Sequence, residues 1–235
     1  MIELFFIRHG QASFGQPAYD QLSPLGEHQS RLLGRYFANG GIHFDAIYAG
    51  AMRRHQQTAT FVLEQMNGQR PDKINIDADF NEFDSSDQMM NRLYQVMRED
   101  RELLATLQRI HTDHGAISRI FELADRLEAL PGTDAERLEH ARAFRERIHG
   151  AIENLIRKEG DRGQKVAIFT SGGPTAVALK KTLETSREQT LRLGWELRNT
   201  SITRLRYDQE RLWLVLFNCV AHLESQNDPS LITYI

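Results

Sequence analysis

Short apolar runs that end at polar residues or glycine recur along the chain and predict buried β-strands. Five segments show this pattern, at residues 2–7, 45–49, 165–170, 200–207 and 211–218. The last two flank the polar residues Asp208, Gln209 and Glu210, so they are expected to form a β-hairpin.

Helix signals lie between these strands. Ser23 and Pro24 are typical of a helix start and predict a helix that reaches about Ala38. A second helix is expected from near Met52 and a third from Pro174. Strands that alternate with helices form sheets covered on both faces. The chain is therefore predicted to be an α/β protein, a three-layer α/β/α sandwich with a mostly parallel central sheet.

The middle of the chain differs, because residues 85–159 contain no convincing strand. Apolar residues recur there at helical spacing, in a first group of Met89, Leu93, Val96, Met97, Leu104, Leu107 and Ile110 and a second group of Leu138, Ala141, Phe144, Ile148, Ile152 and Leu155. We interpret segment 85–159 as a helical insertion within a single domain of residues 1–235, placed as a lid or side wall over a site.

Composition and charge are those of an ordinary soluble globular protein, with 40% hydrophobic and 26% charged residues. Lys and Arg number 29 and Asp and Glu number 32, so the net charge is −3. This balance gives no general attraction to nucleic acid or to an anionic membrane. Any anion site must therefore be a local cluster of cations.

The single cysteine, Cys219, excludes an intrachain disulfide and a cysteine-rich zinc site. Charges at Glu3 and Arg8 leave no room for the apolar region of a signal peptide, and no stretch approaches the roughly 20 apolar residues that span a membrane. We therefore expect a cytoplasmic protein with no membrane partner and no nucleic-acid partner. The sequence specifies no oligomeric state.

Arg8, His9 and Gly10 follow the first predicted strand. Open α/β sheets build their sites at the carboxyl ends of strands. The sequence therefore places an arginine and a histidine together where such a site would form. An imidazole can act as a nucleophile, and a guanidinium beside it can hold a phosphate with two hydrogen bonds. An ordinary histidine at a strand end is the alternative interpretation of His9.

Two further segments place anion-binding groups at helix starts. Arg53 and Arg54 lie in the first turn of the second predicted helix, where they oppose the helix dipole unless an anion binds. Ser171-Gly172-Gly173-Pro174 joins a strand to a helix, and its glycines let backbone N–H groups approach an anion. The alternatives are two solvated arginines and a plain strand–helix turn.

Glu82 lies between Phe80 and Phe83, and a carboxyl group among apolar rings is a candidate proton donor. The alternative is a surface carboxylate on a loop. His222 follows the last predicted strand and is interpreted as a hydrogen-bonded structural residue in preference to a catalyst. The remaining histidines are scattered and predict no metal site, namely His28, His43, His55, His111, His114, His140 and His149.

Together these segments resemble the histidine phosphatase superfamily, which includes the cofactor-dependent phosphoglycerate mutases. Residues Leu4–Gly10 are similar to its signature strand and loop, and Leu22-Ser23-Pro24-Leu25-Gly26 to its Leu-Thr-x-x-Gly helix start. Arg54-His55-Gln56-Gln57-Thr58-Ala59 is similar to its Arg-Ala-x-Gln-Thr-Ala pattern, which selects Arg54 over Arg53. His222-Leu223 resembles a late His-Leu pair of the family.

The resemblance implies a metal-independent phosphomonoester hydrolase that needs no cofactor. His9 would attack the phosphorus and become a phosphohistidine, and Glu82, which falls where the family keeps its acid, would protonate the leaving alcohol. The substrate would be a small molecule or another phosphomonoester. Positioning and charge neutralisation dominate phosphoryl transfer, so the residues that bind the phosphate matter most: Arg8, Arg54, Ser171 and Gly172.

Departures from the family pattern keep alternatives open. The family has Ser/Thr-His-Gly-Gly where this chain has Thr170-Ser171-Gly172-Gly173, so an uncharged serine replaces a histidine. The first loop lacks a hydroxyl at Ala12 and an amide at Gly15, which argues against a tuned phosphoglycerate mutase. The main alternative is a weakened or inactive relative that binds phosphorylated ligands, followed by a mutase-type phosphotransferase.

Overall fold

The computed structural model describes residues 1–13, 20–66, 71–83, 134–160 and 164–234. Within them a six-stranded sheet has the order β3-β2-β4-β1-β5-β6. Strands β1 to β4 pair in parallel, whereas β5 is antiparallel to both β1 and β6. The prediction of an α/β protein with a mostly parallel sheet is confirmed. The strand bounds are β1 Ile2–Arg8, β2 Ala46–Ala49, β3 Ile74–Ile76, β4 Lys165–Thr170, β5 Ile202–Asp208 and β6 Arg211–Cys219.

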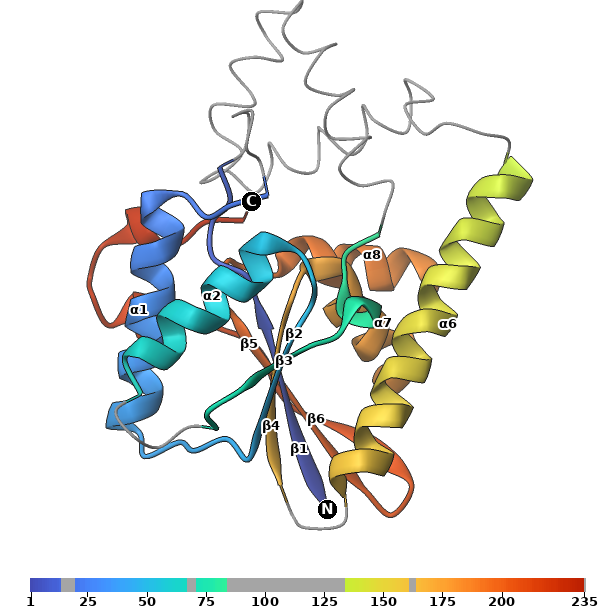
Figure 1. Cartoon of the computed structure of the whole chain (residues 1–235). Helices are drawn as coiled ribbons and strands as arrows, with labels where there is room; N and C mark the ends of the chain where they lie inside the picture. The colour runs from blue at the N-terminus through green and yellow to red at the C-terminus, as the bar shows by residue number, and fades with distance from the viewer. Residues whose placement is uncertain (14–19, 67–70, 84–133, 161–163, 235) are drawn as a thin grey trace, which may run out of the picture.

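Helices cover both faces of this sheet (Figure 1). Helices α1 (Pro24–Asn39) and α2 (Arg53–Glu64) lie on one face, while α6 (Asp134–Glu159) and α7 (Gly172–Leu183) lie on the other. The alternation of side chains along β1 explains the two cores. Phe5 and Ile7 pack into the core beneath α1 and α2, whereas Leu4 and Phe6 pack into the core beneath α6 and α7.

Shorter elements join these layers. They are helix α8 (Arg187–Glu196), helix α9 (Ala221–Glu224) and the 3-10 turns η1 (Ala78–Phe80) and η3 (Pro229–Leu231). The hydrophobic pattern does not predict β3 and α8, because β3 has only three residues and Thr190 is the only buried residue of α8. A capping box between Ser186 and Gln189 is the local signal that marks the start of α8.

The insertion predicted for residues 85–159 needs a correction at its C-terminal end. In α6, the side chains of Ile148, Ile152 and Leu155 are buried against the sheet. This helix is therefore a layer of the sandwich and not a lid over it. The rest of the predicted lid, residues 85–133, lies outside the described residues.

Gly34 of α1 and Gly150 of α6 form a matched pair that tests the packing of α1 on α2. A Cβ on Gly34 would lie 2.2 Å from the carbonyl oxygen of Val62, whereas a Cβ on Gly150 would meet no atom within 4 Å. Gly34→Ala is expected to lower the free energy of unfolding by about 1–3 kcal/mol through overpacking. Gly150→Ala should raise it by about 0.5–1 kcal/mol through helix propensity. Urea unfolding measures both, and a stabilising Gly34→Ala would contradict the close approach of the two helices.

Candidate active site at the ends of β1, β2 and β4

The carboxyl ends of β1, β2 and β4 lie side by side, so the segments that follow these strands meet. The pairing register sets Arg8 opposite Thr170, and the N–H of His9 donates to the carbonyl of Thr170 over 2.8 Å. The N–H of Gly50, just after β2, donates to the carbonyl of Phe169 over 3.0 Å. Residues that are far apart in the sequence therefore surround one point at the edge of the sheet.

His9 is 5% exposed, and its Nδ1 lies 2.7 Å from the carbonyl oxygen of Gly10. A carbonyl oxygen only accepts hydrogen bonds, so Nδ1 carries the proton and Nε2 carries the lone pair of the neutral ring. Burial lowers the pKa of His9 well below 6.5, and the neighbouring Arg54, Arg8 and His55 lower it further. The imidazole is thus neutral at neutral pH, with Nε2 available as a nucleophile or base.

Arg8 lies beside the start of α7. Its guanidinium donates to the carbonyl of Leu197, and a Cβ added to Gly172 would lie 3.9 Å from its Nε. The charge of Arg8 also contributes to lowering the pKa of His9. The structure therefore brings Arg8, His9 and Gly172 together, as the sequence predicts.

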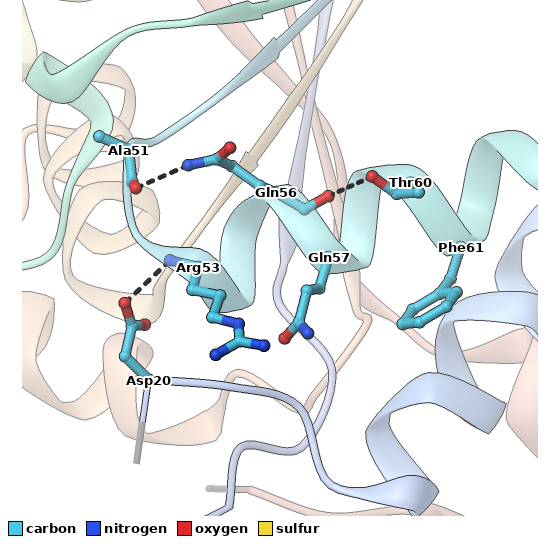
Figure 2. A pocket seen from close by; sticks show the side chains of 7 residues that line it. All are labelled: Asp20, Ala51, Arg53, Gln56, Gln57, Thr60 and Phe61. Atoms are coloured by element: carbon cyan, nitrogen blue, oxygen red, sulfur yellow. Dashed lines mark hydrogen bonds between the residues drawn. The ribbon is translucent and has the colours of Figure 1, made fainter. Parts of the chain in front are cut away.

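Arg54 is buried in the first turn of α2, and its Nη1 lies 2.8 Å from Oδ1 of Asp20. Asp20 also accepts from the backbone N–H groups of Arg53 and Arg54, at 2.8 and 3.4 Å, and Figure 2 shows the first of these contacts. The N-cap residue Met52 offers no side-chain acceptor, so Asp20 supplies the anion at this helix start. Sequence reasoning missed Asp20, which reaches α2 from a separate loop.

Glu82 is held against the first turn of α7. Its Oε2 accepts from the N–H of Gly173 over 3.0 Å, and its Oε1 accepts from the N–H of Phe83 over 2.9 Å. A Cβ on Gly173 would lie only 2.0 Å from Oε1 of Glu82, so this close approach requires glycine. The carboxyl group of Glu82 therefore lies at the start of α7, the helix that begins directly after Ser171.

Arg147 of α6 holds the loop that carries Glu82. Its guanidinium donates to four carbonyl groups of that loop, those of Ala78, Asp79, Asn81 and Glu82, at 2.8–3.3 Å. The hydroxyl of Thr170 donates to the remaining carbonyl, that of Phe80, over 2.5 Å. Five carbonyl groups in a row are thus satisfied by side chains, which fixes the backbone from which Glu82 extends.

His55 is a member of this cluster that sequence reasoning missed. Its ring is fully buried and stacks at 5.7 Å between centroids on the ring of His9, and its Nε2 lies 2.6 Å from Oγ of Ser171. Burial, followed by the charge of Arg54, lowers the pKa of His55 well below 6.5. The available signal is that His55 departs from the family pattern after Arg54, just as Ser171 departs from it after Thr170.

His222 has the structural role expected of it. Its Nε2 lies 2.8 Å from Oγ1 of Thr200, whose hydroxyl donates to the carbonyl of Asn199. Burial lowers the pKa of His222 to about 3, so it stays neutral and donates to Thr200. The N–H of Thr200 and the side chain of Asn199 both donate to the carbonyl of His9, at 3.3 and 3.1 Å. His222 thus supports the backbone of His9 from behind.

A hollow of about 380 Å³ lies on the outer side of α2 (Figure 2). Its lining includes Asp20 but none of His9, Arg8 or Glu82, so it adjoins the candidate site without containing it. The lining residues are Asp20, Ala51, Arg53, Gln56, Gln57, Thr60 and Phe61. Across the described residues, no three side chains of His, Cys, Asp or Glu gather as metal ligands. No helix in the described ranges has the length and apolar sequence to cross a membrane.

Comparison with known sequences gives one match over nearly the whole chain. The profile of the histidine phosphatase superfamily (branch 1) matches residues 4–220. A broad-specificity phosphatase of Saccharomyces cerevisiae is 37% identical over 70 residues, which make up 27% of this chain and 30% of that protein. The chain therefore aligns with less than a third of the length of this curated relative.

Solved structures with a similar fold cover more of the chain. A variant of the phosphoserine phosphatase of Entamoeba histolytica, in complex with phosphoserine, has 16% identity and a TM-score of 0.61 over 95% of this chain and 100% of that one. The α-ribazole phosphatase of Shigella flexneri has 20% identity and a TM-score of 0.61 over 93% and 96% of the two chains. These likenesses concern the fold, and the profile match gives the assignment: the chain belongs to the histidine phosphatase superfamily, branch 1.

Proposed function

We propose that this protein is a metal-independent phosphomonoester hydrolase that acts through a phosphohistidine on His9. The observation that carries the proposal is the state of His9, a neutral buried imidazole whose Nδ1 is engaged by Gly10 and whose neighbours include two guanidinium groups. A nucleophile needs the free lone pair on Nε2, and a phosphate dianion needs the positive charge around it.

In the proposed first step, Nε2 of His9 attacks the phosphorus, and the bond from phosphorus to the ester oxygen breaks. Glu82 in its acid form gives its proton to that oxygen, which leaves as an alcohol. Arg8, Arg54, Ser171 and the N–H of Gly172 hold the three other phosphoryl oxygens. The ring, now phosphorylated on Nε2, keeps the proton on Nδ1, and this N–H still donates to the carbonyl of Gly10.

In the proposed second step, water attacks the phosphohistidine. The carboxylate of Glu82 accepts a proton from the water, the bond from Nε2 to phosphorus breaks, and inorganic phosphate leaves. Both enzyme residues return to their starting states. The two arginines supply charge neutralisation that a metal ion supplies in other phosphoryl-transfer enzymes.

Superfamily membership supports a phosphatase, and the relatives include phosphatases whose names or bound ligands point to small phosphorylated molecules. We propose the same substrate class here, a small-molecule phosphomonoester. A cytoplasmic location stays a prediction from the sequence.

The alternative of a phosphate-binding protein without turnover rests on Ser171, which stands where the family has a histidine.

Ala12, which replaces a hydroxyl residue of the family pattern, is buried and bridges to Leu22, so its methyl group serves packing. This arrangement favours a hydrolase over a mutase-type phosphotransferase, because the loop lacks a polar side chain at that position.

The phosphohistidine is tested by brief exposure to a radiolabelled alkyl phosphomonoester and an alkaline quench. The protein should acquire a label that is acid-labile and alkali-stable. His9→Ala should abolish the label, whereas the control His43→Ala, at an exposed position, should retain it. Label on the His9→Ala protein would show that the nucleophile is another residue. Absence of both label and turnover in the unmodified protein would favour the binding alternative.

Substitutions of the adjacent arginines Arg53 and Arg54 in α2 test which of them binds the phosphate. Arg54 is 1% exposed and close to His9, whereas Arg53 is exposed at the surface. Arg54→Lys keeps the charge but loses the planar pair of donors, so kcat/KM should fall on the order of 10²-fold. Arg53→Lys should change kcat/KM by less than about threefold, as expected for a solvated cation. Steady-state kinetics on one substrate decides, and equal effects of the two changes would contradict the role of Arg54.

The role of Glu82 is tested by the leaving group. Glu82→Gln should lower kcat/KM for alkyl phosphates by about 10²–10⁴-fold, because their alkoxide leaving groups need a proton. Aryl phosphates with acidic phenols should lose less than about tenfold. The exposed carboxylate Glu188, paired with Arg192 on α8, provides the control Glu188→Gln, which should leave both rates unchanged. Equal losses on the two substrate classes would show that Glu82 only positions the ligand.

A further inference from the structure

His55 and Ser171 form a buried polar pair beside His9. They are joined by a 2.6 Å hydrogen bond between Nε2 and Oγ, and their exposed fractions are 0% and 1%. Ser171 follows Thr170, and His9 follows Arg8, the partner of Thr170 across β1 and β4. The serine and the candidate nucleophile thus occupy equivalent places on neighbouring strands.

The direction of the hydrogen bond follows from the other nitrogen of the ring. Nδ1 of His55 is buried and has no hydrogen-bond partner among the described residues. It faces Gly50, where an added Cβ would lie 2.3 Å away. An orphaned buried N–H is rarer in proteins than an unfilled acceptor, so Nδ1 carries the lone pair and Nε2 carries the hydrogen. The ring therefore donates to Ser171.

Ser171 has no competing structural duty for its hydroxyl group. It is the N-cap of α7, yet its side chain makes no capping hydrogen bond. A serine cap normally accepts from the second or third residue of the helix. Here the second residue is Gly173, whose N–H donates to Glu82, and the third is Pro174, which has no N–H. With its oxygen accepting from His55, the hydroxyl of Ser171 keeps its proton for another acceptor.

We propose that His55 is a positioning residue that holds the hydroxyl of Ser171 so that its proton is donated to a phosphoryl oxygen on His9. This inference rests on the proposed function and assigns the second donor of that site. The chain N–H···O–H···O polarises along its length, so the imidazole strengthens the hydroxyl as a donor. Burial and Arg54 keep His55 neutral, which preserves the single N–H that the chain needs.

The pair also explains why a serine suffices at the end of β4. An imidazole contributes to the site from α2, one residue after Arg54, and reaches the phosphate through Ser171. Arg8 and Arg54 already supply positive charge near His9. A neutral donor pair adds hydrogen bonding without adding a third cation that would have to be buried.

A substitution series at His55 separates positioning from packing. His55→Gln places an amide N–H at a similar reach, whereas His55→Leu fills similar space with no donor. His55→Leu and Ser171→Ala should each slow phosphorylation of His9 on the order of 10²-fold in single-turnover assays. His55→Gln should recover to within about tenfold of the unmodified protein. Equal rates for Gln and Leu, with both proteins folded by thermal unfolding, would overturn the proposal.

A double-mutant cycle and a transfer of the imidazole to position 171 test the coupling between His55 and Ser171. If His55 acts through Ser171, the protein with both His55→Leu and Ser171→Ala should be no slower than the slower single variant. Independent, multiplying losses would overturn the proposal. In the second arm, His55→Ala with Ser171→His moves the imidazole to the end of β4. This double variant should be at least about tenfold faster than either single change, and no recovery would count against the pair.

A spectroscopic readout distinguishes failure of this inference from failure of the proposed function. The Nε2 proton of His55 should be visible by ¹⁵N-edited NMR and should shift when inorganic phosphate binds, but not in Ser171→Ala. A phosphate-induced shift of the His55 signal in a protein without phosphatase activity would support the His55–Ser171 pair and contradict the proposed hydrolase activity. Phosphatase activity that depends on His9, without any shift of the His55 signal, would support the hydrolase and contradict the proposed role of the His55–Ser171 pair.

Discussion

The parallel pairing of β1 with β4 is the contact on which the candidate site depends. Its register places Arg8 beside Thr170, so the next residues, His9 and Ser171, leave the sheet at the same edge. The side chains along both strands are almost entirely buried between two helical layers, which leaves no freedom for the register to slip. A packing requirement of the core thus sets the positions of the polar groups at its rim.

Charge is distributed unevenly around this edge. Two guanidinium groups and two neutral imidazoles surround one point, and Asp20 balances the buried Arg54 from the side of α2. Burial lowers the pKa values of His9 and His55, which avoids further positive charge in a poorly solvated place. We propose that an anionic phosphoryl group suits this environment, because the guanidinium groups of Arg8 and Arg54 attract negative charge and can donate hydrogen bonds to its oxygens.

Two glycines make the close packing of the polar groups possible. A Cβ on Gly173 would collide with Glu82, and a Cβ on Gly50 would collide with the ring of His55. The space that each glycine leaves is filled by a polar side chain from another element, Glu82 beside Gly173 and His55 beside Gly50. Arg147 and Thr170 then fix the loop that carries Glu82, so the carboxyl group approaches α7 from a rigid backbone.

The sequence by itself determined five of the six strand positions to within a residue or two, because buried runs are written in consecutive residues. Local motifs also placed Arg8 and His9 at a strand end, and Arg54 and Gly172 at helix starts. The sequence did not reveal β3, whose three residues are too few for a pattern. Only the tertiary structure decided that α6 is a layer of the sandwich, that Asp20 balances Arg54, and that His55 meets Ser171 across 116 positions. Such contacts depend on how α2 and α7 are placed on the sheet, and the spacing of residues along the chain does not predict that placement.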